Sequence, residues 1–346
     1  MNHLNVIGVD LAKSVIQVCQ LNKFNKMTSN KELSIKRFHQ FIAKQPKSLI
    51  AFEACGRSHH WARTVQALGH EAVILPPQRV SPFRQGHKTD YNDAFAVAIC
   101  ASQPEIKPVG IMNLEQQSLQ SDLRVQQHLS SQLQATGNMI RGLLAEFGIE
   151  INKGHSAFRK AMPEVLEENG QRLPIAARES IHISWQLWQD LEKQVKKMDR
   201  LLARRARQNP FCRSLMELEG VGEKNAIGLY AAIGDGRQFK NGRNAAACIG
   251  LTPKQHSSGG KKKIGRIGKH LGNQQLRSKA ILGAHAVIMQ LDKREPRNKK
   301  EEWLQRLIER RGKGRAAVAL ANKTVRTAWS MLRYNESYRA PEALMA

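Results

Sequence analysis

The sequence is poor in aromatic residues and in long apolar runs. Aromatics make up 5% of its 346 residues, which argues against an aromatic-rich sandwich or a cage for an apolar ligand. No uncharged apolar stretch reaches the roughly 18 residues that a membrane-spanning helix needs. The N-terminal residues show neither a basic segment nor a small-residue cleavage site. We therefore expect no secretory signal, no membrane partner and a cytoplasmic location.

Cysteine is scarce and forms no pattern. The five cysteines lie far apart and include no CxxC pair: Cys19, Cys55, Cys100, Cys212 and Cys248. This spacing indicates neither a zinc ribbon nor a disulfide framework. The simplest interpretation is a set of reduced thiols in an intracellular protein.

Acidic residues are strongly outnumbered by basic ones. The chain has 29 Asp and Glu against 55 Lys and Arg, a formal net charge of +26. Such a charge points to a polyanion, nucleic acid first and an anionic membrane second, although a solvated basic surface is the alternative. Residues 1–110 carry +7, residues 111–208 carry +3 and residues 209–346 carry +16. We expect the last region to contact phosphate backbone.

Three regions with different periodicity follow one another along the chain. In residues 1–112, strand-like and helix-like segments alternate, which is typical of an α/β layer fold. The strands are expected at 5–11, 14–21, 48–55 and 71–77, and the helices at 35–45, 59–69 and 90–102. Residues 113–208 read as a long helical spacer. Residues 209–346 read as mainly α-helical, interrupted by a glycine-rich basic loop from Gly250 to Gly272.

The spacer contains two long amphipathic helices. Leucines recur at helical spacing between Leu114 and Phe147, and a second apolar seam runs through a helix from about Pro174 to Arg207. Such helices must pack on each other or on another subunit. We interpret them as a helical hairpin or coiled coil for oligomerisation; an intramolecular bundle is the alternative.

Four carboxylates in the first region form an ordered set. Asp10 and Glu53 each end an apolar strand, and Asp90 and Asp93 share one face of a helix. Crowded carboxylates repel one another unless a cation lies between them, and an all-oxygen site suits Mg²⁺ or Mn²⁺. The sequence therefore predicts a divalent-metal site. Taken singly, each residue has a plainer explanation as a turn or helix-capping residue.

The basic loop of the third region carries two adjacent serines, Ser257 and Ser258. A serine hydroxyl beside cations could attack a phosphate, and the cations would stabilise charge on the phosphoryl oxygens. The alternative is a simple phosphate-binding loop with the serines as turn residues. No nucleotide-binding P-loop is visible. If the protein exchanges nucleic-acid strands, the bond energy must therefore be kept in a covalent intermediate or passed on by direct transesterification. The candidate phosphate contacts are Lys261, Lys262, Lys263, Arg266, Lys269 and Arg277.

A segment upstream of this loop resembles a helix-hairpin-helix element. In LMELEGVGEKNAIGLYAAIGD, Gly220 and Gly222 would form the hairpin and offer backbone N–H groups to a phosphate. An ordinary helix–turn–helix in a core is the alternative.

The two constellations together resemble the insertion-sequence transposases of the IS-one-ten family, in its IS-eleven-eleven branch. The resemblance runs from GVDLAKS through GLTPKQHSSGG and GRIGKHLG to ERRGKGRAAVALANKTVRTAW. It implies an RNase H-like, resolvase-like DEDD domain over 1–112, the coiled-coil spacer over 113–208 and a serine transposase domain over 209–346. It places the metal ligands at Asp10, Glu53, Asp90 and Asp93, and the catalytic serine at Ser258 rather than at Ser257.

The resemblance also implies partners and a reaction. Members of this family are DNA recombinases that are guided by a bridge RNA and act on donor and target DNA. They work as tetramers built from dimers, in which the acidic domain of one subunit meets the serine domain of another. We accordingly expect a prokaryotic, nucleoid-associated protein. In GKHLGNQQLR, one extra residue between Lys269 and Gly272 departs from the shorter form in many relatives.

Two other functions compete with this one. A metal-dependent junction nuclease would use water as its nucleophile, release free DNA ends and tolerate loss of both serines. A non-catalytic nucleic-acid-binding protein would bind with a steep salt dependence and need no metal. The complete set of four carboxylates argues against the second of these.

Overall fold

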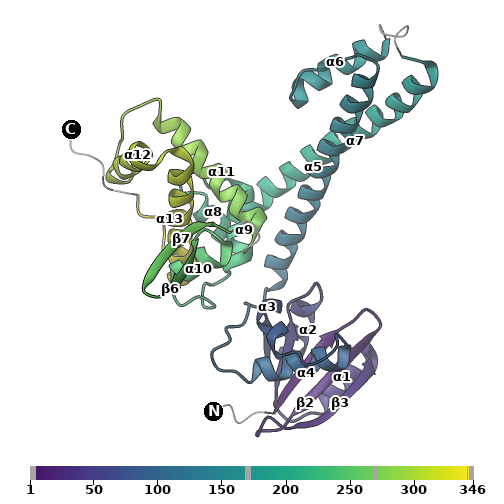
Figure 1. The fold of residues 1–346 in the computed structure, drawn as a ribbon, viewed down its shortest axis with the longest axis vertical. Helices are drawn as coiled ribbons and strands as arrows, with labels where there is room; N and C mark the ends of the chain where they lie inside the picture. The colour runs from purple at the N-terminus through teal and green to yellow at the C-terminus, as the bar shows by residue number, and fades with distance from the viewer. Residues whose placement is uncertain (1–4, 168–172, 269–271, 341, 343–346) are drawn as a thin grey trace. The chain divides into compact units, whose positions relative to one another are not determined.

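The computed structural model describes residues 5–167, 173–268, 272–340 and 342 (Figure 1). The chain divides into two compact units. The first comprises residues 1–116 with 233–245 and 332–334, and the second comprises 117–232, 246–331 and 335–346. The second unit contains most of both long helices and most of the C-terminal region. The domain boundaries expected near residues 112 and 208 stay predictions.

The first unit is built on a five-stranded mixed sheet in the order β3-β2-β1-β4-β5. The central strand β1 (Val6–Leu11) pairs antiparallel with β2 (Val15–Leu21) and parallel with β4 (Leu49–Glu53). β3 (Met27–Ser34) and β5 (Glu71–Leu75) form the two edges. The predicted α/β class of this region is confirmed, and the topology is consistent with an RNase H-like fold.

Strand β3 is absent from the prediction. Its sequence, MTSNKELS, is almost entirely polar and mostly exposed, so it has none of the apolar alternation that marks a half-buried strand. The strand is positioned by its pairing with β2 and by the turn before it, in which Asn25 adopts a left-handed conformation with φ 58°.

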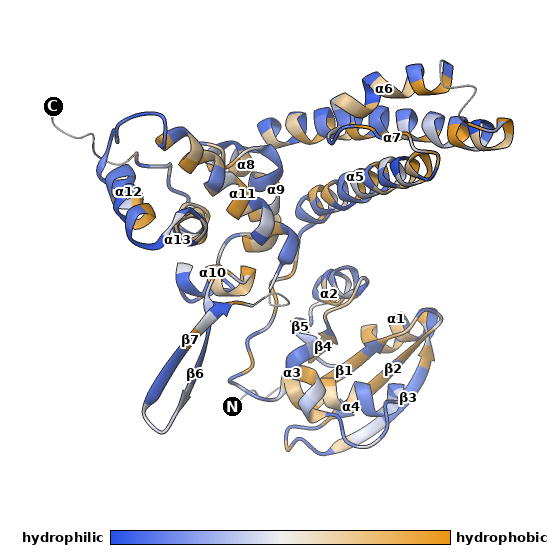
Figure 2. Cartoon of the chain, turned by 45° about the horizontal axis from the view of Figure 1, so that its top comes forward, coloured by the Kyte–Doolittle hydropathy of each residue, from blue (hydrophilic) through white to orange (hydrophobic). Residues whose placement is uncertain are grey.

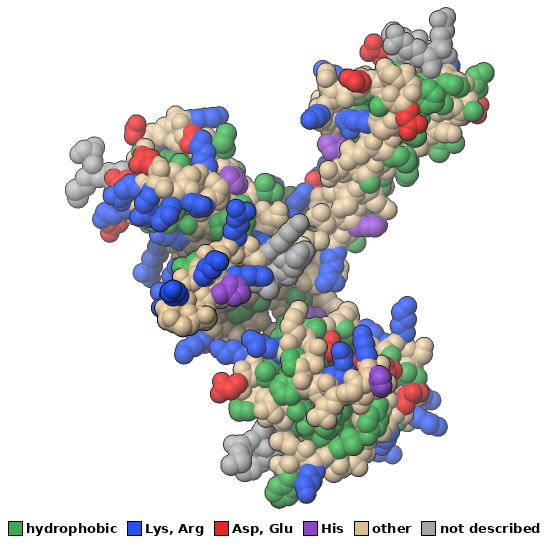
Figure 3. Space-filling view, viewed as in Figure 1, with side chains coloured by type: hydrophobic (Ala, Val, Ile, Leu, Met, Phe, Trp, Pro, Cys, Tyr) green, Lys and Arg blue, Asp and Glu red, His purple; other side chains and the backbone are tan. Residues whose placement is uncertain are grey.

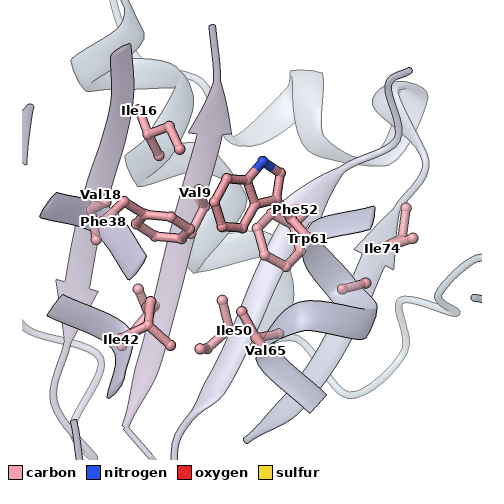
Figure 4. Close-up of a cluster of buried hydrophobic side chains, with 12 residues drawn as sticks. Val9, Ile16, Val18, Phe38, Ile42, Ile50, Phe52, Trp61, Val65 and Ile74 are labelled. Carbon is pink, nitrogen blue, oxygen red and sulfur yellow. The ribbon is translucent and has the colours of Figure 1, made fainter. Parts of the chain in front are cut away.

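Helices cover both faces of this sheet. On one face, α1 (Ile35–Ala43) and α2 (Ser58–Ala67) enclose the apolar core drawn in Figure 4, where the rings of Phe38 and Trp61 meet edge to face at 5.0 Å. The other face is covered by α4 (Asp90–Ala101), which follows α3 (Pro77–Val80) and a 3-10 turn (Ser81–Phe83). The strand residues that face α4 are smaller, because the helix lies close to the sheet.

Three helices form one end of the second unit. The predicted long helices are α5 (Leu114–Glu146) and α7 (Ile175–Gln208), and between them lies α6 (His155–Glu167), which the sequence analysis does not predict. Phe158 of α6 contacts Trp185 and Trp188 of α7, and the three helices share one buried core. This part of the apolar seam is therefore buried within a single chain, as the bundle alternative requires. The coiled coil stays a prediction.

The rest of the second unit is mainly α-helical, as predicted. Its helices are α8 (Pro210–Leu215), α9 (Glu223–Ile233), α10 (Gly242–Ile249, shared with the first unit), α11 (Gln274–Leu291), α12 (Lys299–Arg311) and α13 (Lys313–Tyr334). The glycine-rich segment is a β-hairpin rather than a loop, formed by β6 (Pro253–Ser258) and β7 (Lys261–Ile267). Among the described residues, no helix combines the length and apolarity needed to cross a bilayer.

Candidate active site

Asp10 and Glu53 lie at the same level on adjacent parallel strands. Val9 of β1 pairs with Phe52 of β4, so the next residue on each strand is one of the two carboxylates. Side chains alternate along a strand, and Val9 and Phe52 belong to the core under α1 and α2. Asp10 and Glu53 therefore point to the opposite face, which α4 covers. This is the convergence that the sequence predicts for the two strand-borne carboxylates.

Helix α4 brings the other two carboxylates to that face. Asp90 and Asp93 lie in its first turn, which Thr89 caps by accepting a hydrogen bond from the Asn92 backbone N–H. The helix comes so close to β1 that a Cβ on Gly8 would lie 2.4 Å from both the Ala94 carbonyl oxygen and the Ala98 nitrogen. Gly8 shares the strand face of Asp10, two residues away. Only glycine at position 8 allows this approach.

The pKa of Asp10 is raised partly by the charges of the other three carboxylates. Burial is the largest cause, followed by the charges of Asp90, Asp93 and Glu53, and together they raise the pKa of Asp10 from 3.8 to about 6. Burial and then the charge of Asp93 raise the pKa of Glu53 as well. The site therefore holds negative charge that the fold alone does not neutralise.

Two cations partly compensate this charge. The Arg84 guanidinium donates a hydrogen bond to an Asp93 carboxylate oxygen at 3.1 Å, and the charges of Lys88 and Arg84 lower the pKa of Glu53. Both residues lie in the segment just before α4. The sequence analysis did not identify Gly8, Arg84 or Lys88. The close contact between α4 and β1 does leave a signal in the sequence. It is a glycine inside an apolar strand together with two small residues, Ala94 and Ala98, four apart on a helix.

The donor set fits a divalent cation in its chemistry. Carboxylate oxygens are the ligands that Mg²⁺ and Mn²⁺ prefer, and a cation would relieve the repulsion that raises the pKa of Asp10. Within the described part of the chain, no three Asp, Glu, His or Cys side chains converge tightly enough to ligate an ion. The arrangement is thus a cluster of the right oxygen donors with no closed coordination sphere.

The predicted serines lie at the tip of the β6–β7 hairpin. A two-residue turn, Gly259–Gly260, joins the strands, and both glycines have positive φ (55° and 77°), as the tight hairpin turn requires. Ser258 is the last residue of β6 and pairs directly with Lys261. All residues from Pro253 to Arg266 are exposed. Figure 2 shows the hairpin as a largely hydrophilic ribbon that projects from the helices of its unit.

The pairing register places the two serines on opposite faces of the hairpin. Directly opposed residues share a face, so Ser258 lies with Lys261, and His256 lies on that face with Lys263. Ser257 lies on the other face with Lys262, and its hydroxyl accepts a hydrogen bond from the Gln255 amide at 3.1 Å. The two hydroxyls therefore have different surroundings.

The remaining predicted nucleic-acid contacts fall into separate groups. Lys261, Lys262, Lys263 and Arg266 are exposed on β7, and Figure 3 shows basic side chains gathered on the visible face of this unit. Arg277 differs from the expectation: it is 9% exposed and donates to the Gly268 carbonyl at 2.8 Å, which ties α11 to the end of β7. As placed, it is a structural residue rather than a surface phosphate contact. Lys269 lies outside the described residues.

The two glycines of the predicted helix-hairpin-helix element also differ from each other. Gly220 has a φ of 78°, and a Cβ there would lie 2.5 Å from the Gly283 carbonyl oxygen of α11. Packing against α11 thus explains this glycine without a phosphate. A Cβ on Gly222 would meet nothing within 4 Å, so close packing does not require a glycine there. The helix-hairpin-helix assignment stays a prediction.

Comparison with known proteins assigns the class to which this fold and these residues belong. Residues 7–149 match a transposase model of the DEDD type, and residues 212–300 match the "Transposase IS116/IS110/IS902 family". The chain is 36% identical over 339 residues to a probable family 20 transposase of Pseudomonas aeruginosa, covering 97% of this chain and 99% of that one. The chain belongs to the IS110 (IS-one-ten) family of insertion-sequence transposases.

Two further similarities complete the comparison. The transposase for insertion sequence element IS1111A of Coxiella burnetii is 33% identical over 98% of this chain and 92% of its own length. A solved structure titled "T. thermophilus RuvC in complex with Holliday junction substrate" matches 31% of this chain at 13% identity, with a TM-score of 0.24. At that score the likeness does not bear on the fold.

Replacing Gly8 with alanine tests the close contact between α4 and β1. The added Cβ would clash with helix backbone, which has no flexible side chain to move aside, so we expect Gly8→Ala to lower the free energy of unfolding by about 3 kcal/mol. Gly56→Ala is the matched control in the same unit, because a Cβ there meets nothing within 4 Å. Urea titration measures both, and equal stabilities for the two variants would contradict the contact.

Replacing Asp10 with asparagine tests the repulsion among the carboxylates. Because folding raises the pKa of Asp10, the charged form destabilises the fold above about pH 6, and this penalty fades as the pH falls toward 3.8. Allowing for solvent screening of a half-buried group, we expect Asp10→Asn to stabilise metal-free protein by about 1 kcal/mol at pH 7.5 and not at pH 4.

Thermal unfolding in EDTA measures this difference. Asp235→Asn is the control, because its carboxylate is exposed and should change stability by less than about 0.5 kcal/mol. An Asp10→Asn protein less stable than the parent at pH 7.5 would show that the carboxylate is held by favourable contacts instead.

Proposed function

We propose that this transposase cuts and rejoins DNA through a covalent link between Ser258 and a DNA phosphate. The observation that carries the proposal is the position of Ser258 at the tip of an exposed basic hairpin, directly opposite Lys261. A projecting tip can reach the backbone of a duplex, and the neighbouring ammonium groups attract the phosphate on which the hydroxyl acts. Ser257 lies on the opposite face, where Gln255 binds its hydroxyl.

The hairpin residues also have a role in the transition state. When an oxygen attacks phosphorus, negative charge accumulates on the non-bridging phosphoryl oxygens, and fixed cations nearby stabilise that charge. Lys261 and Lys263 share the face of Ser258 and would contact the reacting phosphate. Lys262 pairs with Ser257 on the other face and would contact DNA phosphates that flank the reacting one.

The four carboxylates would hold a divalent metal ion, Mg²⁺ or Mn²⁺, as the second part of the catalytic machinery. Asp10, Glu53, Asp90 and Asp93 are the residues that would ligate it. Such an ion supplies positive charge at phosphoryl oxygens and at the leaving oxygen. Support comes from the raised pKa of Asp10, whose cause is burial together with the charges of the other three. Arg84 and Lys88 supply positive charge that offsets part of this repulsion.

We propose a bridge RNA together with donor and target DNA as the partners of this protein. Its net charge of +26 is large enough to be shared between several polyanions. We also propose a tetramer built from dimers, in which the carboxylate cluster of one subunit acts with the hairpin of another. Ile183 and Leu187 of α7, one helical turn apart and 67% and 53% exposed, are apolar residues that a neighbouring subunit would cover.

Formation of a protein–DNA adduct tests the proposal. The full-length chain is purified with its copurifying RNA and incubated with Mg²⁺ and duplexes that carry the ends and flanks of its insertion sequence. We expect an SDS-resistant adduct from the parent and from Ser257→Ala, and none from Ser258→Ala, because only Ser258 supplies the attacking oxygen. Quantitative gel electrophoresis measures the adduct.

The alternative outcomes distinguish the competing functions. An adduct that persists in Ser258→Ala would remove this serine as the nucleophile. Cleavage to free ends without any adduct, retained in both serine variants, would instead establish a metal-dependent nuclease that uses water.

A further inference from the structure

The face of the hairpin that carries Ser258 also carries a group able to take up a proton. His256 lies two residues before Ser258 on β6, and residues two apart on a strand project to the same side, with Cα atoms about 6.6 Å apart. The observed hydrogen bond between Gln255 and Ser257, also two apart, shows that side chains at this spacing reach each other on this strand. His256 and Ser258 have the same spacing along the strand and share the opposite face.

The other side chains on this face do not compete for the same role. His256 pairs directly with Lys263, Ser258 pairs with Lys261, and Lys254 lies two residues before His256. All three are lysines, a residue type that supplies hydrogen-bond donors and positive charge rather than a proton acceptor. No carboxylate lies on the hairpin, whose strands contain no Asp or Glu. Imidazole is the side chain that accepts protons near neutral pH.

We propose that His256 is the general base that activates Ser258, an inference that rests on the serine reaction proposed above. As the Ser258 Oγ forms its bond to phosphorus, its proton passes to a ring nitrogen of His256. The bond between phosphorus and the leaving deoxyribose oxygen breaks, and its electron pair goes to that oxygen, which takes a proton from water. In rejoining, the incoming DNA hydroxyl gives its proton to the hydroxide left in the first step, and its oxygen bonds to phosphorus. The bond between phosphorus and the Ser258 oxygen breaks, and the imidazolium returns its proton to that oxygen.

This role separates the two serines by chemistry as well as by position. Ser257 has a glutamine as its same-face neighbour at the same spacing, and an amide cannot accept the proton of an attacking hydroxyl near neutral pH. Ser258 has a histidine. The alternation of the strand therefore gives one of two adjacent serines a base and gives the other only a hydrogen-bond donor.

The rate of adduct formation as a function of pH tests the proposal. With the full-length protein, its copurifying RNA and the DNA duplexes described above, single-turnover rates are measured from pH 5.5 to pH 9. We expect the parent rate to rise with pH and then level off, the profile that general-base catalysis by a histidine produces. We expect His256→Ala to lose this rise and to form adduct about a hundredfold more slowly at pH 7.5. Added imidazole should restore part of the rate to this variant.

Gln255→Ala is the control variant for His256→Ala. Gln255→Ala changes the adjacent residue on the other face and should keep the parent's pH profile. DNA affinity, measured by filter binding, should be the same in His256→Ala and Gln255→Ala, which separates proton transfer from loss of hairpin structure. A His256→Ala protein with the parent's rate and pH profile would overturn the role of His256 while leaving Ser258 as the nucleophile. A parent protein that forms no adduct would instead overturn the serine reaction itself.

Discussion

The close approach of α4 to β1 over Gly8 is the contact on which the cluster of four carboxylates depends. Backbone atoms of Ala94 and Ala98 occupy the space that any side chain at position 8 would need. Because Asp93 directly precedes Ala94 and Asp10 lies two residues beyond Gly8, the same contact brings carboxylates from a helix and a strand to one place. Packing forces acidic groups together that would repel each other in water, and the raised pKa of Asp10 is the electrostatic consequence.

The basic β6–β7 hairpin is exposed rather than packed. The β6–β7 hairpin buries almost nothing and is held by its own backbone pairing and by Arg277, which donates to Gly268 where β7 ends. A two-stranded ribbon of this kind is only marginally stable alone in water. Its exposed cations repel one another until a polyanion lies against them. The carboxylate cluster and the basic hairpin thus each gather charge of one sign, so each would be stabilised by a ligand of the opposite charge.

Much of this arrangement could be predicted from the sequence. The apolar strands that end in Asp10 and Glu53 and the capped helix start at Thr89 identify the carboxylate cluster, because strand alternation and helix capping are local patterns. The polar edge strand Met27–Ser34 could not be predicted, since only its pairing with β2 positions it. Helix α6 was not predicted for a different reason. Its apolar residues Phe158, Met162, Val165 and Leu166 follow helical spacing, but Pro163 lies within the helix, a position that proline disfavours.

The candidate site shows the same division. Composition indicates a basic segment that contains Lys261 and two adjacent serines, and only the family resemblance points to Ser258. The direct pairing of Ser258 with Lys261 depends on a two-residue turn whose register fixes which side chains share a face. Arg277 reads in the sequence as one more surface cation. Its burial follows from the packing of α11 against the hairpin base, which no local pattern reveals.

The proposed reaction requires a covalent bond between the Ser258 oxygen and a DNA phosphate during recombination. Tandem mass spectrometry of a nuclease-trimmed, protease-digested adduct measures this directly. The account predicts a nucleotide phosphate on the peptide that contains Ser257 and Ser258, with fragment ions that assign it to Ser258. Assignment to Ser257, or to any residue outside the hairpin, would contradict it.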